Sequence, residues 1–121
     1  MTENSGVVRL IHVRTGREIA RLEIARSLFQ RMRGLLGRSG LPAGQGMLIE
    51  RCSSIHTFFM KFALDVIFLD SDWEVRRVAR DLRPWRLANA FGASCVVELA
   101  AGALEGTDVA AGDALKIEEI P

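Results

Sequence analysis

Long apolar runs are absent from this sequence of 121 residues. No stretch approaches the roughly 18 consecutive apolar residues that a membrane-spanning helix requires. The N-terminal sequence MTENSGVVRLIHVR also lacks the apolar core of an export signal. We therefore expect a cytoplasmic protein that does not interact with membranes.

An excess of either charge is also missing, because the formal net charge is only +1. A balance of this kind provides no global attraction to nucleic acid or to an anionic surface, so we expect no nucleic-acid partner. The arginines are locally clustered around residues 26–38 and 76–86. This clustering favours solvated faces, with an anion-binding patch as the alternative.

Cysteine is scarce, and Cys52 and Cys95 stand far apart with no Cys-x-x-Cys pair. This spacing indicates neither a zinc site nor a redox motif, and both thiols are expected to be small buried hydrophobic groups. The glycine-rich segment GRSGLPAGQG is not followed by Gly-Lys-Ser or Gly-Lys-Thr, which argues against a phosphate-binding loop. We expect no metal and no cofactor.

What the sequence does contain is a series of short strand patterns. Alternating apolar residues on both sides of Thr15-Gly16 predict an antiparallel hairpin over residues 7–24. The segment SLFQRMRGLL has a helical apolar stripe, with Ser27 as N-cap, and predicts one short helix over residues 27–36. Further strands are expected at 47–50, 65–70, 74–82, 94–102 and 114–120, with a helical turn or two near residues 102–109. The strands at 65–70 and 74–82 are expected to form a second hairpin.

This pattern predicts a single domain over residues 1–121. About seven short strands and one clear helix, without regular alternation of strands and long helices, indicate an α+β fold with a mostly antiparallel, barrel-like sheet. The core is expected to include Phe58, Met60, Phe68 and Val97.

The segment SSIHTFFMKFALDVIFLD, residues 53–70, places polar side chains among four phenylalanines. Asp65 lies between apolar runs, and a buried carboxylate must be paired or hydrogen-bonded because an isolated buried charge is costly. One interpretation is a site in which Lys61, Asp65 and His56 come together. The other is a partly exposed Lys61–Asp65 ion pair worth less than about 1 kcal/mol, with His56 as a hydrogen-bonded turn residue.

Glu98 raises the same question, because it interrupts the apolar strand SCVVELAAG. Arg83 and Arg86 in RPWR are candidate partners, on a loop that Pro84 stiffens and Trp85 can anchor. Two carboxylates with these arginines, a histidine and a tryptophan are sufficient to build a polar pocket.

The motifs RMRGLLGRSGL, GMLIERCSSIHTFFMKFALDVIFLD, RPWR and VVELAAGALEGTDVAAGDAL occur in this order. In these motifs the chain resembles the family called domain of unknown function 192, from about Arg31 to Leu115. Many relatives have Phe-Trp-Met-Lys followed by Asn-Thr, whereas this chain has HTFFMKFALDV. The resemblance implies a small β-rich α+β fold with the motif residues at one end, and no established activity. The family pattern falls on Arg33, Gly34, Leu35, Gly46, Met47, Met60, Lys61, Asp65, Pro84, Glu98, Gly102, Gly112 and Asp113.

Three functions are compatible with these residues. The first is a binding module for a small polar or anionic ligand. The second is a structural or protein-interaction domain, and the third is a small acid–base enzyme with Asp65 or Glu98 as base and Lys61 or His56 as acid. No nucleophile motif assigns catalytic residues, and the sequence specifies no oligomeric state. The candidate ligand-binding residues are Arg33, His56, Lys61, Asp65, Trp85, Arg86 and Glu98.

Overall fold

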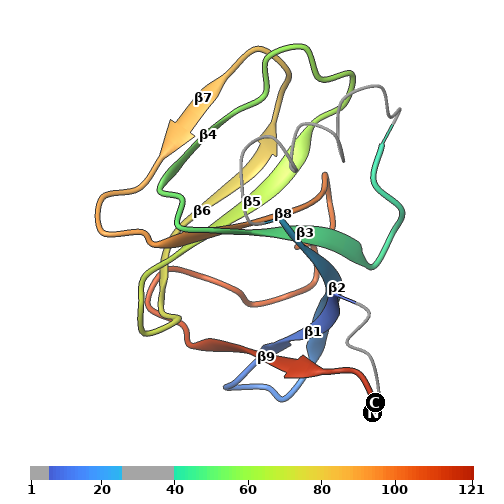
Figure 1. Cartoon of the computed structure of the whole chain (residues 1–121), viewed down its shortest axis with the longest axis vertical. Coiled ribbons are helices and arrows are strands. Elements are labelled where there is room, and N and C mark those ends of the chain that lie inside the picture. The colour runs from blue at the N-terminus through green and yellow to red at the C-terminus, as the bar shows by residue number, and fades with distance from the viewer. Residues whose placement is uncertain (1–5, 26–39) are drawn as a thin grey trace.

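The structure is a computed structural model that describes residues 6–25 and 40–121. Nine strands lie within these residues, connected by turns and irregular loops (Figure 1). They are β1 (Val7–His12), β2 (Glu18–Ala25), β3 (Gln45–Glu50), β4 (Ser54–His56), β5 (Leu64–Leu69), β6 (Val75–Leu82), β7 (Leu87–Asn89), β8 (Cys95–Ala100) and β9 (Leu115–Glu119). No helix in the described residues has the length and apolar character that would let it cross a membrane.

Strands β1 and β2 form the antiparallel hairpin that the alternating pattern predicted. Val8 pairs with Leu22, and Leu10 pairs with Ala20, so that four buried side chains share one face. Gly16 closes the turn with a φ of 73°, a left-handed conformation that glycine adopts without steric cost. The predicted hairpin is therefore confirmed, as is the second hairpin, in which β5 pairs antiparallel with β6.

Seven strands form one sheet in the order β6-β5-β8-β3-β2-β1-β9. Every neighbouring pair is antiparallel except β2 and β3. The two ends of this order approach each other, because Glu74 and Ala114 form an isolated bridge and the Leu115 N–H donates to the Trp73 carbonyl over 3.0 Å. The sheet is thus curled into a half-barrel (Figure 1).

The inside of the half-barrel is one apolar cluster. Val75 on β6 and Leu115 on β9 belong to the same cluster although their strands are at opposite ends of the sheet, which requires the sheet to wrap around it. Gly46 on β3 permits close packing in this region, since a Cβ atom there would lie 2.5 Å from the carbonyl oxygen of Glu98.

A second apolar cluster covers the outer face of β3, β5 and β8. The small antiparallel sheet of β4 and β7 packs there through Ile55 and Ala88. Of the four residues expected in the core, Phe68 in this cluster and Val97 in the inner cluster are fully buried, and Met60 is 5% exposed. Phe58 is only half-buried. These two clusters face opposite sides of the main sheet because successive residues of a strand point to alternate faces.

The predicted α+β class is wrong. Residues 40–121 contain strands and turns without a helix, and the segment near residues 102–109 forms successive turns. The class depended on the helix predicted over residues 27–36, which lies outside the described residues. A small, strongly curled sheet fills its interior with its own side chains and with the 101–113 segment, so the described core needs no helical layer. The mostly antiparallel, barrel-like sheet is present.

Truncation of Phe68 tests the importance of the outer cluster. Phe68→Ala removes a fully buried ring and should lower the free energy of unfolding by about 3–5 kcal/mol, measured by urea denaturation. Phe91→Ala is the control, because that ring is fully exposed and its loss should change stability by less than about 0.5 kcal/mol. Equal effects of the two substitutions would contradict the assigned core.

Candidate functional site

Asp65 is held by the backbone. Its side chain is 2% exposed, and its two carboxylate oxygens accept three backbone N–H groups. Oδ1 accepts the N–H of Asp81 at 2.9 Å, and Oδ2 accepts those of Gly102 and Leu104, each at 3.1 Å. Asp65 thereby ties β5 to the end of β6 and to the turn after β8, which satisfies the predicted need for a partner.

Glu98 is fully buried on β8, with interactions of its own. It pairs with Val66, a residue of the outer cluster, whereas Asp65 pairs with Leu99, a residue of the inner cluster. Paired residues of neighbouring strands share a face, so Glu98 and Asp65 point to opposite faces of the sheet. The two carboxylates therefore do not meet in one pocket.

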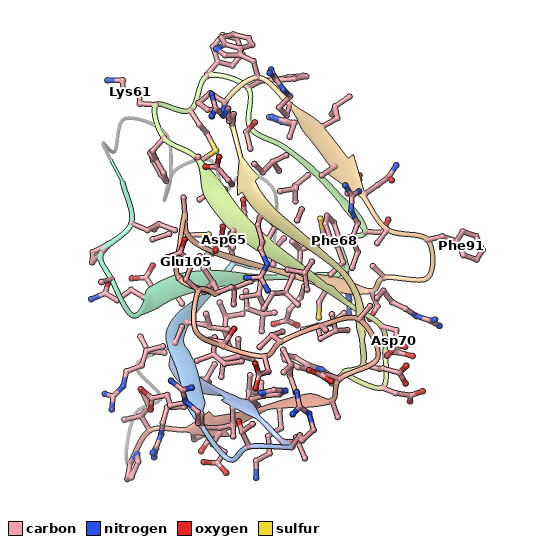
Figure 2. All side chains as sticks on the ribbon, turned by 180° about the vertical axis from the view of Figure 1, so that it is seen from behind. Lys61, Asp65, Phe68, Asp70, Phe91 and Glu105 are labelled. Atoms are coloured by element: carbon pink, nitrogen blue, oxygen red, sulfur yellow. The ribbon has the colours of Figure 1, made fainter. Side chains whose placement is uncertain are left out.

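Lys61 lies in the loop between β4 and β5 and points outward, away from Asp65 (Figure 2). Among the described side chains, no ion pair connects Lys61 with Asp65. His56, Trp85 and Arg86 lie near the other end of this loop: His56 and Trp85 both stack on Phe58, and the Arg86 backbone bonds to Thr57. Arg33 lies outside the described residues.

Thr57 is a residue that the sequence analysis missed. It is fully buried, and its hydroxyl donates to the Arg83 carbonyl at 2.6 Å and accepts the Arg86 N–H at 2.9 Å. Its backbone also exchanges hydrogen bonds with the other loop, donating to the Arg86 carbonyl and accepting the Trp85 N–H. Thr57 thus fastens the loop after β4 to the loop after β6, a long-range pairing that no local sequence signal reveals.

A row of aromatic rings extends from this junction. His56 and Phe58 have ring centroids 4.9 Å apart, Phe58 and Trp85 5.8 Å, and Phe59 and Trp85 4.7 Å. Phe59 and Trp85 have left-handed φ angles of 66° and 64° and are 65% and 56% exposed. Left-handed backbone is costly for bulky residues, so the fold holds Phe59 and Trp85 in a backbone conformation that they disfavour.

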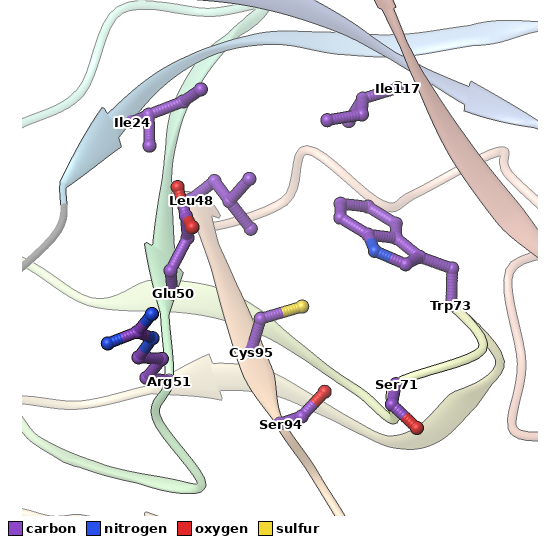
Figure 3. A pocket seen from close by; sticks show the side chains of 9 residues that line it. All are labelled: Ile24, Leu48, Glu50, Arg51, Ser71, Trp73, Ser94, Cys95 and Ile117. Atoms are coloured by element: carbon purple, nitrogen blue, oxygen red, sulfur yellow. The ribbon is translucent and has the colours of Figure 1, made fainter.

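A concave pocket of about 410 Å³ opens beside the inner cluster on the other side of the sheet (Figure 3). Trp73 forms one wall, and its position is set by the turn after β5, in which Asp70 accepts the N–H groups of Asp72 and Glu74. Trp73 and Arg51, both pocket residues, also have left-handed φ angles of 61° and 53°. The pocket is lined by Ile24, Leu48, Glu50, Arg51, Ser71, Trp73, Ser94, Cys95 and Ile117.

No sequence pattern predicts this concave pocket, because its residues come from five separate segments of the chain. Cys95 was correctly expected to be a buried thiol and is 7% exposed, whereas Cys52, for which burial was also expected, is only half-buried. Burial, followed by the nearby charges of Glu50 and Asp70 and by Cys52, raises the pKa of the Cys95 thiol to about 11. Cys95 is therefore a neutral thiol at neutral pH and contributes a small apolar wall to the pocket.

A polar cluster of His12, Thr15 and Asp113 joins the β1–β2 turn to the turn before β9. The buried His12 Nε2 lies 2.9 Å from Asp113 Oδ2, and its Nδ1 lies 3.1 Å from Thr15 Oγ1. Partial burial on its own would raise the pKa of Asp113, but the Ala110 N–H, His12 and Arg14 together lower it. In the described part of the chain, no three His, Cys, Asp or Glu residues are grouped as a metal site.

Residues 10–117 match the model of the DUF192 family, described as "Uncharacterized ACR". The chain belongs to the DUF192 family. The resemblance seen in the sequence motifs is thereby confirmed. The family description states no activity.

Relatives of this DUF192 protein support the family and the fold. A "UPF0127 protein" of Thermococcus sibiricus is 34% identical over an alignment of 103 residues. The alignment covers 81% of this chain and 66% of that relative, just under two thirds of its length. A crystal structure from Sinorhizobium meliloti 1021, provisionally described as a transcription regulator, has a TM-score of 0.77 at 28% identity and covers 92% of both chains. A Novosphingobium aromaticivorans protein of unknown function has a TM-score of 0.75 at 24% identity, over 91% of this chain and 83% of its own.

Asp65→Asn tests the backbone tie. The substitution places an NH2 group where a carboxylate oxygen accepts backbone N–H groups, and it should lower the free energy of unfolding by about 1–3 kcal/mol in urea denaturation. Asp108→Asn is the matched control at an exposed position outside the strands and should be nearly neutral. Unchanged or increased stability of Asp65→Asn would contradict a structural role for this carboxylate.

Acid titration tests the Asp113 cluster. A carboxyl whose pKa is lowered by folding stabilises the protein above its unfolded pKa, about 4, and this contribution is lost as the pH falls through the folded pKa. The difference in unfolding free energy between the wild type and Asp113→Asn should therefore shrink as the pH is lowered from 7 toward about 2. A difference that stays constant or grows in acid would show that the Asp113 charge is not stabilising.

Proposed function

We propose that this protein is a small-molecule binding module whose ligand occupies the concave pocket shown in Figure 3. The observation that carries the proposal is the pocket of about 410 Å³ with apolar walls and a polar rim. Ligand pockets are typically about 300–1,000 Å³ and combine a mostly apolar lining with a few polar groups.

The distribution of side chains indicates the kind of ligand. Trp73, Ile24 and Ile117 provide apolar surface, and Glu50 and Arg51 project from the neighbouring edge (Figure 3). An apolar or aromatic body would pack against the indole and the two isoleucines. A polar or anionic end would lie toward the Arg51 guanidinium, where a charge-assisted hydrogen bond is available.

The side chains that line the pocket favour binding of a ligand without a chemical reaction. The Cys95 thiol is neutral because its pKa is raised to about 11, so it is a poor nucleophile at neutral pH. None of the described residues that line the pocket is a histidine that could activate Ser71 or Ser94 as a nucleophile. The left-handed backbone at Trp73 and Arg51 is consistent with residues held in place for a ligand.

The two tryptophans allow a direct test. Trp85→Phe leaves Trp73 as the single tryptophan, so its fluorescence reports on the pocket. Titration with 1-anilinonaphthalene-8-sulfonate, an aromatic anion, should quench Trp73 emission with a saturable isotherm. Ile117→Glu, which places a negative charge at a partly exposed wall, should weaken this binding about tenfold, equivalent to about 1.4 kcal/mol.

Phe91→Ala in the same Trp85→Phe background is the control, because Phe91 is exposed and does not line the pocket. It should bind the probe as the parent does. Circular dichroism and urea midpoints establish that each variant is folded, since partly folded states also bind this probe. Linear, non-saturating quenching, or equal binding by Ile117→Glu, would contradict the proposed ligand site.

A further inference from the structure

The exposed pair Phe59 and Trp85, called the aromatic tip, has no role in the concave pocket. The loops that carry it, between β4 and β5 and between β6 and β7, lie together at one end of the long axis of the molecule (Figure 1). The two rings are 65% and 56% exposed, with centroids 4.7 Å apart and planes inclined by 58°. Exposed apolar groups held together in this way typically mark an interaction surface.

The two loops that carry the aromatic tip are hydrogen-bonded to each other in the free protein. Thr57 connects the two loops through its hydroxyl and its backbone, with hydrogen bonds of 2.6–3.0 Å to Arg83, Trp85 and Arg86. Both tip residues have left-handed backbone. A partner would therefore bind to rings that are already ordered, and would lose less conformational entropy in doing so.

Positive charge surrounds the aromatic tip. Lys61 follows Phe59 by two residues, and Arg83 and Arg86 flank Trp85; all three side chains are exposed. Arg83 Nε lies 3.7 Å from Asp81, an exposed pair that water screens. Within the described residues, the Arg86 guanidinium donates over 3.4 Å to carbonyls of its own loop. The loops thus combine aromatic rings with an excess of cations.

We infer that the aromatic tip docks an acidic, partly apolar segment of a partner protein. Tryptophan and arginine are the residue types most enriched at the energetic centres of protein interfaces. The rings would enter apolar contact with the segment, and Lys61, Arg83 and Arg86 would face its carboxylates. Charge complementarity of this kind selects the partner and accelerates its association.

Other occupants fit the tip less well. Trp85 already has ring contacts with Phe58 and Phe59, which leaves less of its face for stacking on a nucleic-acid base. Each Lys or Arg near an anionic bilayer adds only about 1 kcal/mol to the binding free energy, and the net charge of +1 adds no general attraction. A symmetric dimer through the tip would place these cations against the same cations of the second copy.

The experiment uses a short fluorescein-labelled peptide in which glutamates alternate with leucine and phenylalanine. Fluorescence anisotropy should show saturable binding to the full chain. Phe59→Ala and Trp85→Ala should each weaken binding at least about tenfold, because each truncation removes on the order of 1.4 kcal/mol of contact. Both residues are exposed, so the variants should retain the parent's unfolding midpoint.

Three controls make the result specific. Phe91→Ala, an equally exposed ring elsewhere on the surface, should bind the peptide as the parent does. A peptide with lysine in place of glutamate should not bind. Arg83→Gln with Arg86→Gln should weaken binding and also reduce its dependence on salt between about 50 and 300 mM NaCl, since screening acts on the lost charges.

Specific outcomes would overturn the inference. These are equal loss of peptide binding in Phe91→Ala, binding of the lysine peptide, or failure of the acidic peptide to bind. Tip-dependent binding to phosphatidylserine vesicles without peptide binding would assign the tip to lipid instead. A dimer in sedimentation velocity that Trp85→Ala dissociates would assign it to self-association. None of these outcomes depends on the concave pocket, whose probe binding Trp85→Phe leaves measurable.

Discussion

The buried carboxylate of Asp65 is the interaction on which the arrangement of the half-barrel depends. It accepts backbone N–H groups from the end of β6 and from the turn that follows β8, so one side chain connects three segments that are distant in sequence. A carboxylate is suited to this position because its two oxygens accept several donors at once. Without it, these N–H groups would lose their acceptor, and the N–H of Leu104 would do so in buried surroundings.

Closure of the sheet adds a second constraint with consequences for function. The turn from Asp70 to Glu74 reaches the start of β9 and holds Trp73 in left-handed backbone. The edge of the half-barrel is therefore also a wall of the concave pocket. At the opposite end, Thr57 performs a comparable task by joining two loops below the aromatic tip. Each of these two surfaces is therefore built on partly buried hydrogen bonds.

The polar residues that attracted attention in the sequence divide between two roles in the structure. Asp65 and Glu98 are buried on opposite faces of the sheet, whereas Lys61, Trp85 and Arg86 belong to exposed loops. Although these residues are close together in the sequence motifs, they do not line one common pocket. The residues that line the concave pocket have no common motif, since Ile24, Trp73 and Ile117 come from distant segments.

The sequence alone determined the two hairpins, the buried β8 strand and the need of Asp65 for partners, because alternation and an isolated acid in apolar surroundings are local signals. It also identified the family through ordered motifs. Only the tertiary structure decided the strand order, the closure between Glu74 and Ala114 and the donors that reach Asp65. These features depend on contacts between segments far apart in the chain, which the pattern of any one segment does not encode.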